Sequence, residues 1–455
     1  MRAKVFLPSV LLALFASGSS AQTFREAVQL ARTSEPVYLG IKANAVAAQE
    51  RSKQAFAGLL PQVNAEASTN ANRRDYQTRG SAIPDSIDHY NSNSAQLKLT
   101  QPIYGPSNNI ALRQAESAVS QADYQLVAAE QELLAKLVTS WFDAMFARDS
   151  VLFTARQETA TRQQWEILRR GVDLGTASEP AAEEARAKHE QALAERTSAE
   201  MEYEVKAAGL EQLIGPLRSF APPYLSNASK TQDLAGESLD TWLERLERSP
   251  QVLAAARALT AADEEIRKQR ALYEPTLDLV GSYGKNSQQV GNFPGQSGYD
   301  IYTGTIGLQL SIPLFAGGGH VAKVSEAIAL REKARQDLAA AQRSSRLAAK
   351  QAWYGWLAAN ARHSAALQAV RSSLLSLRAA LQGIQSGVKT EVDRLQAVLL
   401  VEGARRDFNK ARYDLIGSFV KLKAIFGQLV DDDVLRLEQM FLEREADLQE
   451  VIALK

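Results

Sequence analysis

The chain has 455 residues, with 52 basic and 52 acidic side chains and no cysteine. A net charge of zero argues against a nucleic-acid-binding protein, because such proteins carry a basic excess. Without cysteine the chain has no disulfide, no thiolate chemistry and no lipid-anchored N-terminal cysteine.

Residues 1–21 have the pattern of a secretory signal peptide. Two basic residues precede an apolar run at 5–16, and small residues follow it. We predict cleavage between Ala21 and Gln22. A buried N-terminal helix is the alternative that this pattern favours less. No later stretch of about 20 residues is apolar enough for a transmembrane helix. The mature chain is therefore expected to be periplasmic, secreted, or inserted in an outer membrane as a barrel.

The mature sequence consists of two copies of one unit, which we place at residues 22–215 and 238–427. Two prolines stand 25 residues apart in each copy (61 − 36 and 275 − 250). Three residues of the first copy recur in the second at a constant offset of 212, namely Trp141, Gly175 and Gly215 as Trp353, Gly387 and Gly427. The order and offset of these matches predict an internal duplication.

Each copy is predicted to run helix, helix, strand, loop, strand and long helical hairpin. Prolines end the opening helices. Apolar and polar residues then alternate, which predicts strands at about residues 61–70, 94–103, 275–284 and 301–313. The stretches between paired strands, 69–93 and 284–300, are rich in Asn, Ser and Gly, and we expect long surface loops there.

The alternation gives each strand one apolar and one polar face. The apolar face would turn inward in a soluble sandwich, but it would face lipid in an outer-membrane barrel. Aromatic residues near the strand ends fit the girdles of such a barrel, although ordinary sheet positions explain each of them equally well: Tyr104, Tyr273, Tyr283, Tyr299, Tyr302 and Phe315. Small barrels already need about eight strands, so four strands in a membrane require several chains to pool them.

Residues 106–215 and 319–427 are expected to form long helical hairpins with alanine in a coiled-coil seam. Trp141 with Phe142, and Trp353 with Tyr354, are expected to be buried packing residues. Positive φ at a glycine would end each outgoing helix, and a hydroxyl followed by an acid would cap each returning helix. The tip residues are Gly175 and Thr176 in the first hairpin, and Gly387, Val388 and Thr390 in the second. A packed linker (216–237) joins the copies, and an acidic tail (428–455) follows.

Several stretches resemble the TolC-type outer-membrane efflux family: LLPQV, LTQPIYG, LSIPLFAGG and VKTEVDRLQA, together with the duplicated order. The resemblance covers essentially the whole mature chain. It implies a mainly α membrane protein and a homotrimer, in which each protomer gives four strands to a 12-stranded barrel and two hairpins to a periplasmic tunnel. It further implies location in the bacterial outer membrane, and an adaptor protein and an inner-membrane ABC or proton-driven transporter as partners.

The resemblance also implies a periplasmic gate at the second tip. Lys389 matches a basic gate residue, and Asp393 matches an aspartate that rings the constriction. Gln396 stands at the position of the family's second aspartate, and Ile384 stands at the position of its gate tyrosine. Ala181 stands at the position of the gate aspartate in the first copy. On a threefold axis three Asp393 carboxylates would converge, repel one another and bind protons or cations. A solvated charge on a helix face is the alternative for Asp393.

The functions open at this point are a passive export duct for proteins or small molecules and a periplasmic coiled-coil adaptor. The duplication and the paired strands favour the duct. A hydrolase is disfavoured because HExxH, GxSxG and CxxC are absent from the sequence. FAGGGH (315–320) lacks the lysine of a phosphate-binding loop and is interpreted as a turn. We expect no cofactor and no metal.

Overall fold

The computed structural model describes residues 23–77, 79–80, 85–216, 223–225, 238–291 and 297–442. The predicted signal peptide with its cleavage site, Ala21–Gln22, lies outside these residues, as do most of the predicted linker and the last part of the tail.

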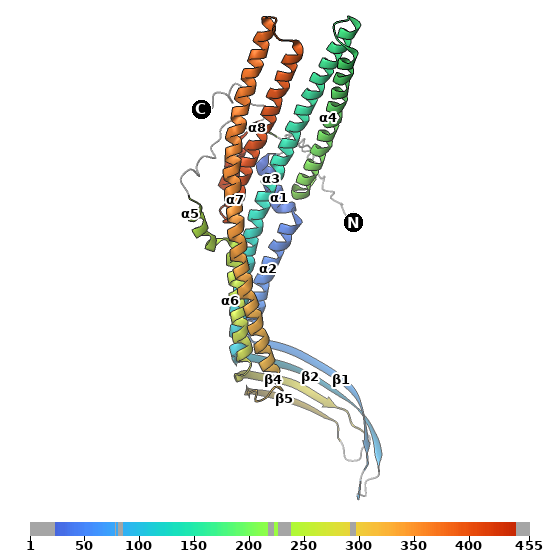
Figure 1. The fold of residues 1–455 in the computed structure, drawn as a ribbon. Coiled ribbons are helices and arrows are strands. Elements are labelled where there is room, and N and C mark those ends of the chain that lie inside the picture. The colour runs from blue at the N-terminus through green and yellow to red at the C-terminus, as the bar shows by residue number, and fades with distance from the viewer. Residues whose placement is uncertain are drawn as a thin grey trace, which may run out of the picture. The chain divides into compact units, whose positions relative to one another are not determined.

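The same order of elements occurs twice in the described chain (Figure 1). The first series is α1 (Phe24–Ser34), α2 (Pro36–Ala57), β1 (Gln62–Tyr76), β2 (Ser86–Tyr104), α3 (Pro106–Asp173) and α4 (Glu179–Ile214). The second is α5 (Leu239–Glu244) with the 3₁₀ turn η2 (Arg245–Arg248), α6 (Pro250–Ala271), β4 (Thr276–Gln288), β5 (Tyr299–Ser311), α7 (Gly319–Gln385) and α8 (Glu391–Ile425). β3 (Tyr224–Leu225) lies between the two series, and α9 (Asp431–Glu438) and β6 (Phe441–Leu442) follow the second. The predicted fold class, a duplicated and mainly helical unit with two long hairpins and four strands, is confirmed.

The chain divides into two compact units that do not coincide with the two repeats. Unit 1 comprises residues 1–39, 129–244 and 347–455, and unit 2 comprises residues 40–128 and 245–346. Each unit therefore draws on both copies of the duplicated sequence. Among the described residues, no helix combines the length and apolar character that crossing a membrane requires.

Unit 2 contains one antiparallel sheet in the order β1-β2-β4-β5. Its register decides which side chains share a face, because residues paired directly across antiparallel strands point the same way. Val63 pairs with Leu99, Leu99 with Gly281, and Gly281 with Ile306. Most apolar residues of the four strands therefore line one face, although Val280 and Ile301 fall on the other. The opposite face carries polar pairs, and the hydroxyl oxygens of Ser282 and Thr305 lie 2.6 Å apart on it.

The strands extend into the stretches that were expected to be loops. β1 continues to Tyr76 and β2 begins at Ser86, while β4 and β5 reach Gln288 and Tyr299. The expectation of loops at 69–93 and 284–300 was therefore wrong for most of those residues. Their polar side chains satisfy one another across the ladder, as Asn72 Nδ2 does by donating to Ser92 Oγ at 2.8 Å. Ladder pairing thus overrides the loop preference of Asn and Ser.

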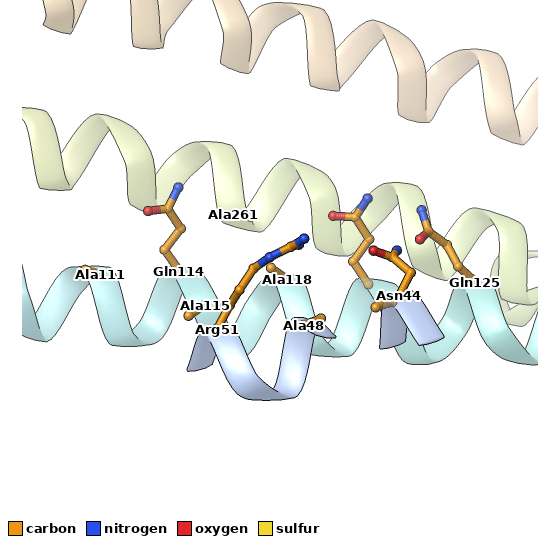
Figure 2. A pocket seen from close by; sticks show the side chains of 11 residues that line it. Asn44, Ala48, Arg51, Ala111, Gln114, Ala115, Ala118, Gln125 and Ala261 are labelled. Carbon is orange, nitrogen blue, oxygen red and sulfur yellow. The ribbon is translucent and has the colours of Figure 1, made fainter. Parts of the chain in front are cut away.

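The helices of unit 2 pack through small side chains. Ala45 and Ala48 of α2 meet Ala122 of α3 in a buried cluster. Beside this cluster is an open groove of about 320 Å³, lined mainly by alanines and amides (Figure 2). At one end of the groove Gln114 Nε2 donates to Glu265 of α6 at 2.6 Å. The groove is a gap in alanine-rich packing, and it does not bring several charged groups together.

In unit 1 the two hairpins have the predicted alanine seam. The buried alanines 185, 192 and 199 of α4 recur every seven residues, as the core positions of a coiled coil do. Side-chain contacts join neighbouring helices in turn. Arg196 of α4 pairs with Glu158 of α3, Arg156 of α3 with a glutamate of α8, and α8 packs on α7 around a buried phenylalanine. The helix order is therefore α4-α3-α8-α7, as Figure 1 also shows.

Three of the four aromatic residues expected in the cores of the arms are buried. Trp141, Phe142 and Trp353 are 0%, 5% and 8% exposed. Tyr354 is 58% exposed, so this part of the expectation was wrong. The reason is position, because α7 is an outer helix of the four and presents one side to solvent, whereas Phe142 of α3 stacks on Tyr413 of α8.

The tail and the linker of unit 1 meet in a short sheet. β3 of the linker pairs antiparallel with β6 of the tail. Phe441 of β6 packs against Phe24, Trp141 and Phe142. The expected acidic helix is present as α9, and Asp433 in its first turn binds Lys423 Nζ at 2.6 Å. The tail as far as residue 442 is therefore part of the core of unit 1.

Candidate functional site: the hairpin tips

The two hairpins end in tips of the same geometry (Figure 1). In the first, Gly175 has φ +69° and Thr176 N–H donates to Gly171 O at 2.8 Å. In the second, Gly387 has φ +74° and Val388 N–H donates to Gly383 O at 2.8 Å. These are the helix-terminating turns that the two tip glycines predict. The offset of 212 relates every residue of this pattern, so the duplication is preserved down to single hydrogen bonds.

A second pair of tip positions requires glycine because a Cβ there would collide with the returning segment. A Cβ at Gly171 would lie 2.9 Å from Ala177 Cβ, and one at Gly383 would lie 2.7 Å from Lys389 Cγ. The returning segment crosses the last turn of the outgoing helix at these points. We did not single out either glycine from the sequence, although their separation of 212 residues was a usable signal.

The returning helices are capped differently, which corrects the expectation of a hydroxyl cap at both tips. Asp393 N–H donates to Thr390 Oγ1 at 3.3 Å, and Thr390 N–H donates to Asp393 Oδ2 at 2.8 Å, which completes a capping box for α8. Ser178 makes no side-chain cap bond to α4. Ala181 occupies the position equivalent to Asp393, so the reciprocal half of the box is missing there.

The capping box also sets the electrostatics of Asp393. The backbone hydrogen bond from Thr390 lowers the pKa of the Asp393 carboxyl, and the Thr390 hydroxyl and the charge of Lys389 lower it further. Within one chain Asp393 is therefore a carboxylate held in place by its own helix terminus. A ring of three such groups would act in the opposite direction, because like charges raise the proton affinity.

The remaining predicted residues lie around this box. Ile384 and Lys389 belong to the turn that precedes it, and Gln396 lies one turn further along α8 on the exposed surface. Val388 at the second tip is 81% exposed. The structure thus brings the residues of the second tip together, while Gly175 and Thr176 form the separate first tip.

A buried polar cluster in unit 1 was missed by sequence reasoning. Asp149 of α3 accepts hydrogen bonds from Arg148 Nη2 at 2.7 Å, Tyr413 Oη at 2.8 Å and Asn409 Nδ2 at 3.0 Å. It thereby ties the first hairpin to the second. Arg148 also donates to Pro223 O at 2.9 Å, so the same cluster holds the linker strand. A lone acid between apolar helical positions carries no local signal for such a role.

Comparison with known proteins agrees with this architecture. The family described as "Outer membrane efflux protein" matches residues 27–216 and 244–428, which is most of both repeats. The outer membrane protein TolC of Vibrio cholerae serotype O1 is 27% identical over 432 residues, covering 94% of this chain and 95% of that protein. The proteases secretion protein PrtF of Dickeya chrysanthemi is 26% identical over 453 residues, covering 97% and 96%.

Solved structures with the same fold include outer-membrane channels. The Campylobacter jejuni CmeC outer membrane channel aligns with a TM-score of 0.72 at 17% identity, covering 99% of this chain and 97% of that chain. VceC of Vibrio cholerae aligns with a TM-score of 0.71 at 18% identity, covering 89% and 96%. Together with the duplicated hairpins and the sheet, the family match shows that this chain belongs to the outer membrane efflux protein family, whose members are outer-membrane transport channels and not enzymes.

Proposed function

We propose that three copies of the chain form a continuous duct that exports proteins, small molecules or both from the periplasmic side. The observation that carries this proposal is the sheet of unit 2. Its apolar face is open, with Ile306, Leu308 and Leu310 exposed at 79%, 65% and 61%. Strands β1 and β5 are its edges. A closed sheet that faces lipid would pair both edges and cover the apolar face at once.

Four strands from each of three copies would close a 12-stranded barrel. The polar face, with Asn64, Lys98 and Ser282, would line its lumen, and the apolar face would contact hydrocarbon. The hairpins would continue the duct on the periplasmic side. A periplasmic adaptor would contact the exposed tips, and an inner-membrane transporter would supply energy. The relatives whose names refer to protease secretion favour a protein cargo.

We place the gate of this duct at the second tip, where Asp393 and Lys389 would converge around the threefold axis with Ile384 and Gln396 nearby. Asp393 then has two roles, since it caps α8 and would form the carboxylate ring. A gate variant must therefore be compared with a variant that loses only the cap.

Single-channel conductance in planar bilayers tests duct and gate together. The wild-type chain should form trimers of fixed conductance that divalent cations block. Asp393→Ala should abolish the block, because no carboxylate remains in the ring. Thr390→Val, which removes the capping hydroxyl but keeps Asp393, should retain the block by divalent cations. Asp407→Ala, which removes an exposed acid elsewhere on α8, should also retain it.

A chain that is monomeric in buffer and forms no channel would reject the duct and favour a periplasmic adaptor. Unchanged block of Asp393→Ala channels would reject the gate alone.

A further inference from the structure

The two outer helices of unit 1 carry opposite charge. α4 contains nine glutamates and four basic residues, a net charge of −5 (4 − 9). The part of α7 in the same unit, 347–385, contains four basic residues and no acid. α3 and α8 separate these helices within one chain, so α4 and α7 are the two outer helices of the four-helix layer (Figure 1).

The charges on each outer helix follow a seven-residue spacing. We define the acidic stripe as the positions Glu183, Glu190, Thr197, Glu204 and Glu211 of α4, and the basic stripe as the positions Lys350, Leu357, Ser364, Arg371 and Arg378 of α7. Nine of the ten positions are exposed, and Arg371 is partly exposed. Each stripe lies on an exposed line of its helix, and the buried alanines of α4 share the seven-residue period. Opposite charges aligned along two neighbouring helices attract one another and can set partner choice and register.

The two stripes also match in height above the tips. Glu183 follows Gly175 by 8 residues (183 − 175), and Arg378 precedes Gly387 by 9 (387 − 378). The second pair, Glu190 and Arg371, lies at 15 and 16 residues (190 − 175 and 387 − 371). The lag of one residue is about 1.5 Å of helix rise.

The match continues to the far end of the stripes. Glu211 and Lys350 lie at 36 and 37 residues from their tips (211 − 175 and 387 − 350). Thr197 and Ser364 lie at matching distances from their tips and are both polar and uncharged. Glu204 and Leu357 also lie at matching distances but are not complementary. An acid and a base therefore lie at matching distances at three of the five positions.

Resting on the proposed trimer, we propose that the basic stripe of one copy docks on the acidic stripe of the next, so that these charges select the partner and set the height of neighbouring hairpins. The occupant is a second copy of this chain, because the complement is present on the same chain at the same spacing and height. Exposed apolar residues on both helices would be covered in the same contact, including Met201 and Val205 on α4 and Leu375 on α7.

Cross-linking tests the contact directly, since the natural chain has no cysteine. Chains carrying Glu190→Cys are co-expressed with chains carrying Arg371→Cys, and the membranes are treated with a short bismaleimide. Only a contact between copies can give a covalent dimer. Ala369→Cys, exposed on the opposite side of α7 from Arg371, replaces the second cysteine in the control and should give none.

Charge reversal tests whether the stripes determine assembly. Arg371→Glu with Arg378→Glu should lower the temperature at which full-length trimers dissociate in detergent, and so should Glu183→Arg with Glu190→Arg. All four changes in one chain should restore that temperature, whereas Arg362→Glu, an off-stripe change on α7, should leave it near the wild-type value.

Trimers that form without the 190–371 cross-link, or reversals that do not rescue each other, would overturn the docking proposal and leave the duct intact. Cross-linking of the basic stripe to an adaptor instead of a second copy would also overturn it. Absence of any trimer from the wild-type chain would overturn the proposed function, and the docking proposal with it.

Discussion

At the scale of single residues, the tips show how glycine and a hydroxyl–acid pair reverse a long helix. Gly387 takes a conformation that L side chains disfavour, with φ +74°. Gly383 leaves room for the Lys389 side chain. Thr390 and Asp393 then start α8 with a capping box. The turn could be predicted from sequence because these preferences are local. The need for glycine at 383 could not be predicted, because it depends on where the Lys389 side chain packs against the last turn of α7.

We expect Gly387→Ala to destabilise the second tip by about 1–2 kcal/mol, because alanine resists positive φ. Amide hydrogen exchange over residues 383–393 should become roughly tenfold faster or more. Gly417→Ala is the matched control. Gly417 lies inside α8 with open space around its Cα and no positive φ, so alanine there should stabilise the helix by about 0.5–1 kcal/mol. Equal behaviour of the two variants would contradict the conformational explanation.

At the scale of elements, the helical hairpins are held to each other by a few buried polar groups. Asp149 is the acceptor for donors from α3 and α8. Burial and the nearby Asp149 charge raise the pKa of the Tyr413 hydroxyl well above its ordinary value. Burial lowers the pKa of Arg412, next to it on α8, to about 10. These hydrogen bonds join α3 to α8 and so hold the two hairpins together.

Tyr413→Phe should destabilise the α3–α8 contact by about 1–3 kcal/mol, because Asp149 loses a buried donor. The raised pKa gives this variant a pH signature. The stability that the Tyr413 proton contributes is complete below its unfolded pKa of about 10 and is lost as pH rises towards the folded pKa. Thermal dissociation followed from pH 8 to 11 should therefore show a smaller difference between wild type and Tyr413→Phe at the alkaline end. Tyr354→Phe changes an exposed hydroxyl and should match the wild type throughout.

At the scale of the whole molecule, the duplicated chain is built for assembly. The sheet of unit 2 leaves its apolar face and two edges open, and the outer helices of unit 1 carry complementary charge stripes. Neither feature stabilises a single copy. Both would acquire a role when copies close around an axis, as the trimer that we propose requires.

Neighbouring substitutions on β5 distinguish the two faces of the sheet. Leu308→Arg places a charge on the apolar face and should cost about 2–4 kcal/mol near the middle of a bilayer. Trimers recovered from outer-membrane fractions should fall sharply. Gln309→Arg, one residue later on the polar face, should assemble normally and alter only conductance. Loss of trimers with Gln309→Arg and not with Leu308→Arg would show that the faces are assigned the wrong way round.

The sequence by itself determined the duplication, the two hairpins with their tips, and the alternation of the four strands. These follow from local rules, namely periodicity, proline and glycine positions and hydroxyl–acid caps, which act within one or two turns of chain. Only the tertiary structure decided that strands from separate repeats share one apolar face, that polar residues extend the ladder, and that α4 and α7 lie on the outside. It alone joined Asp149 to Asn409 and Tyr413, which are 260 and 264 residues away. Such contacts depend on register and packing between distant segments, for which a single sequence carries no periodic signal.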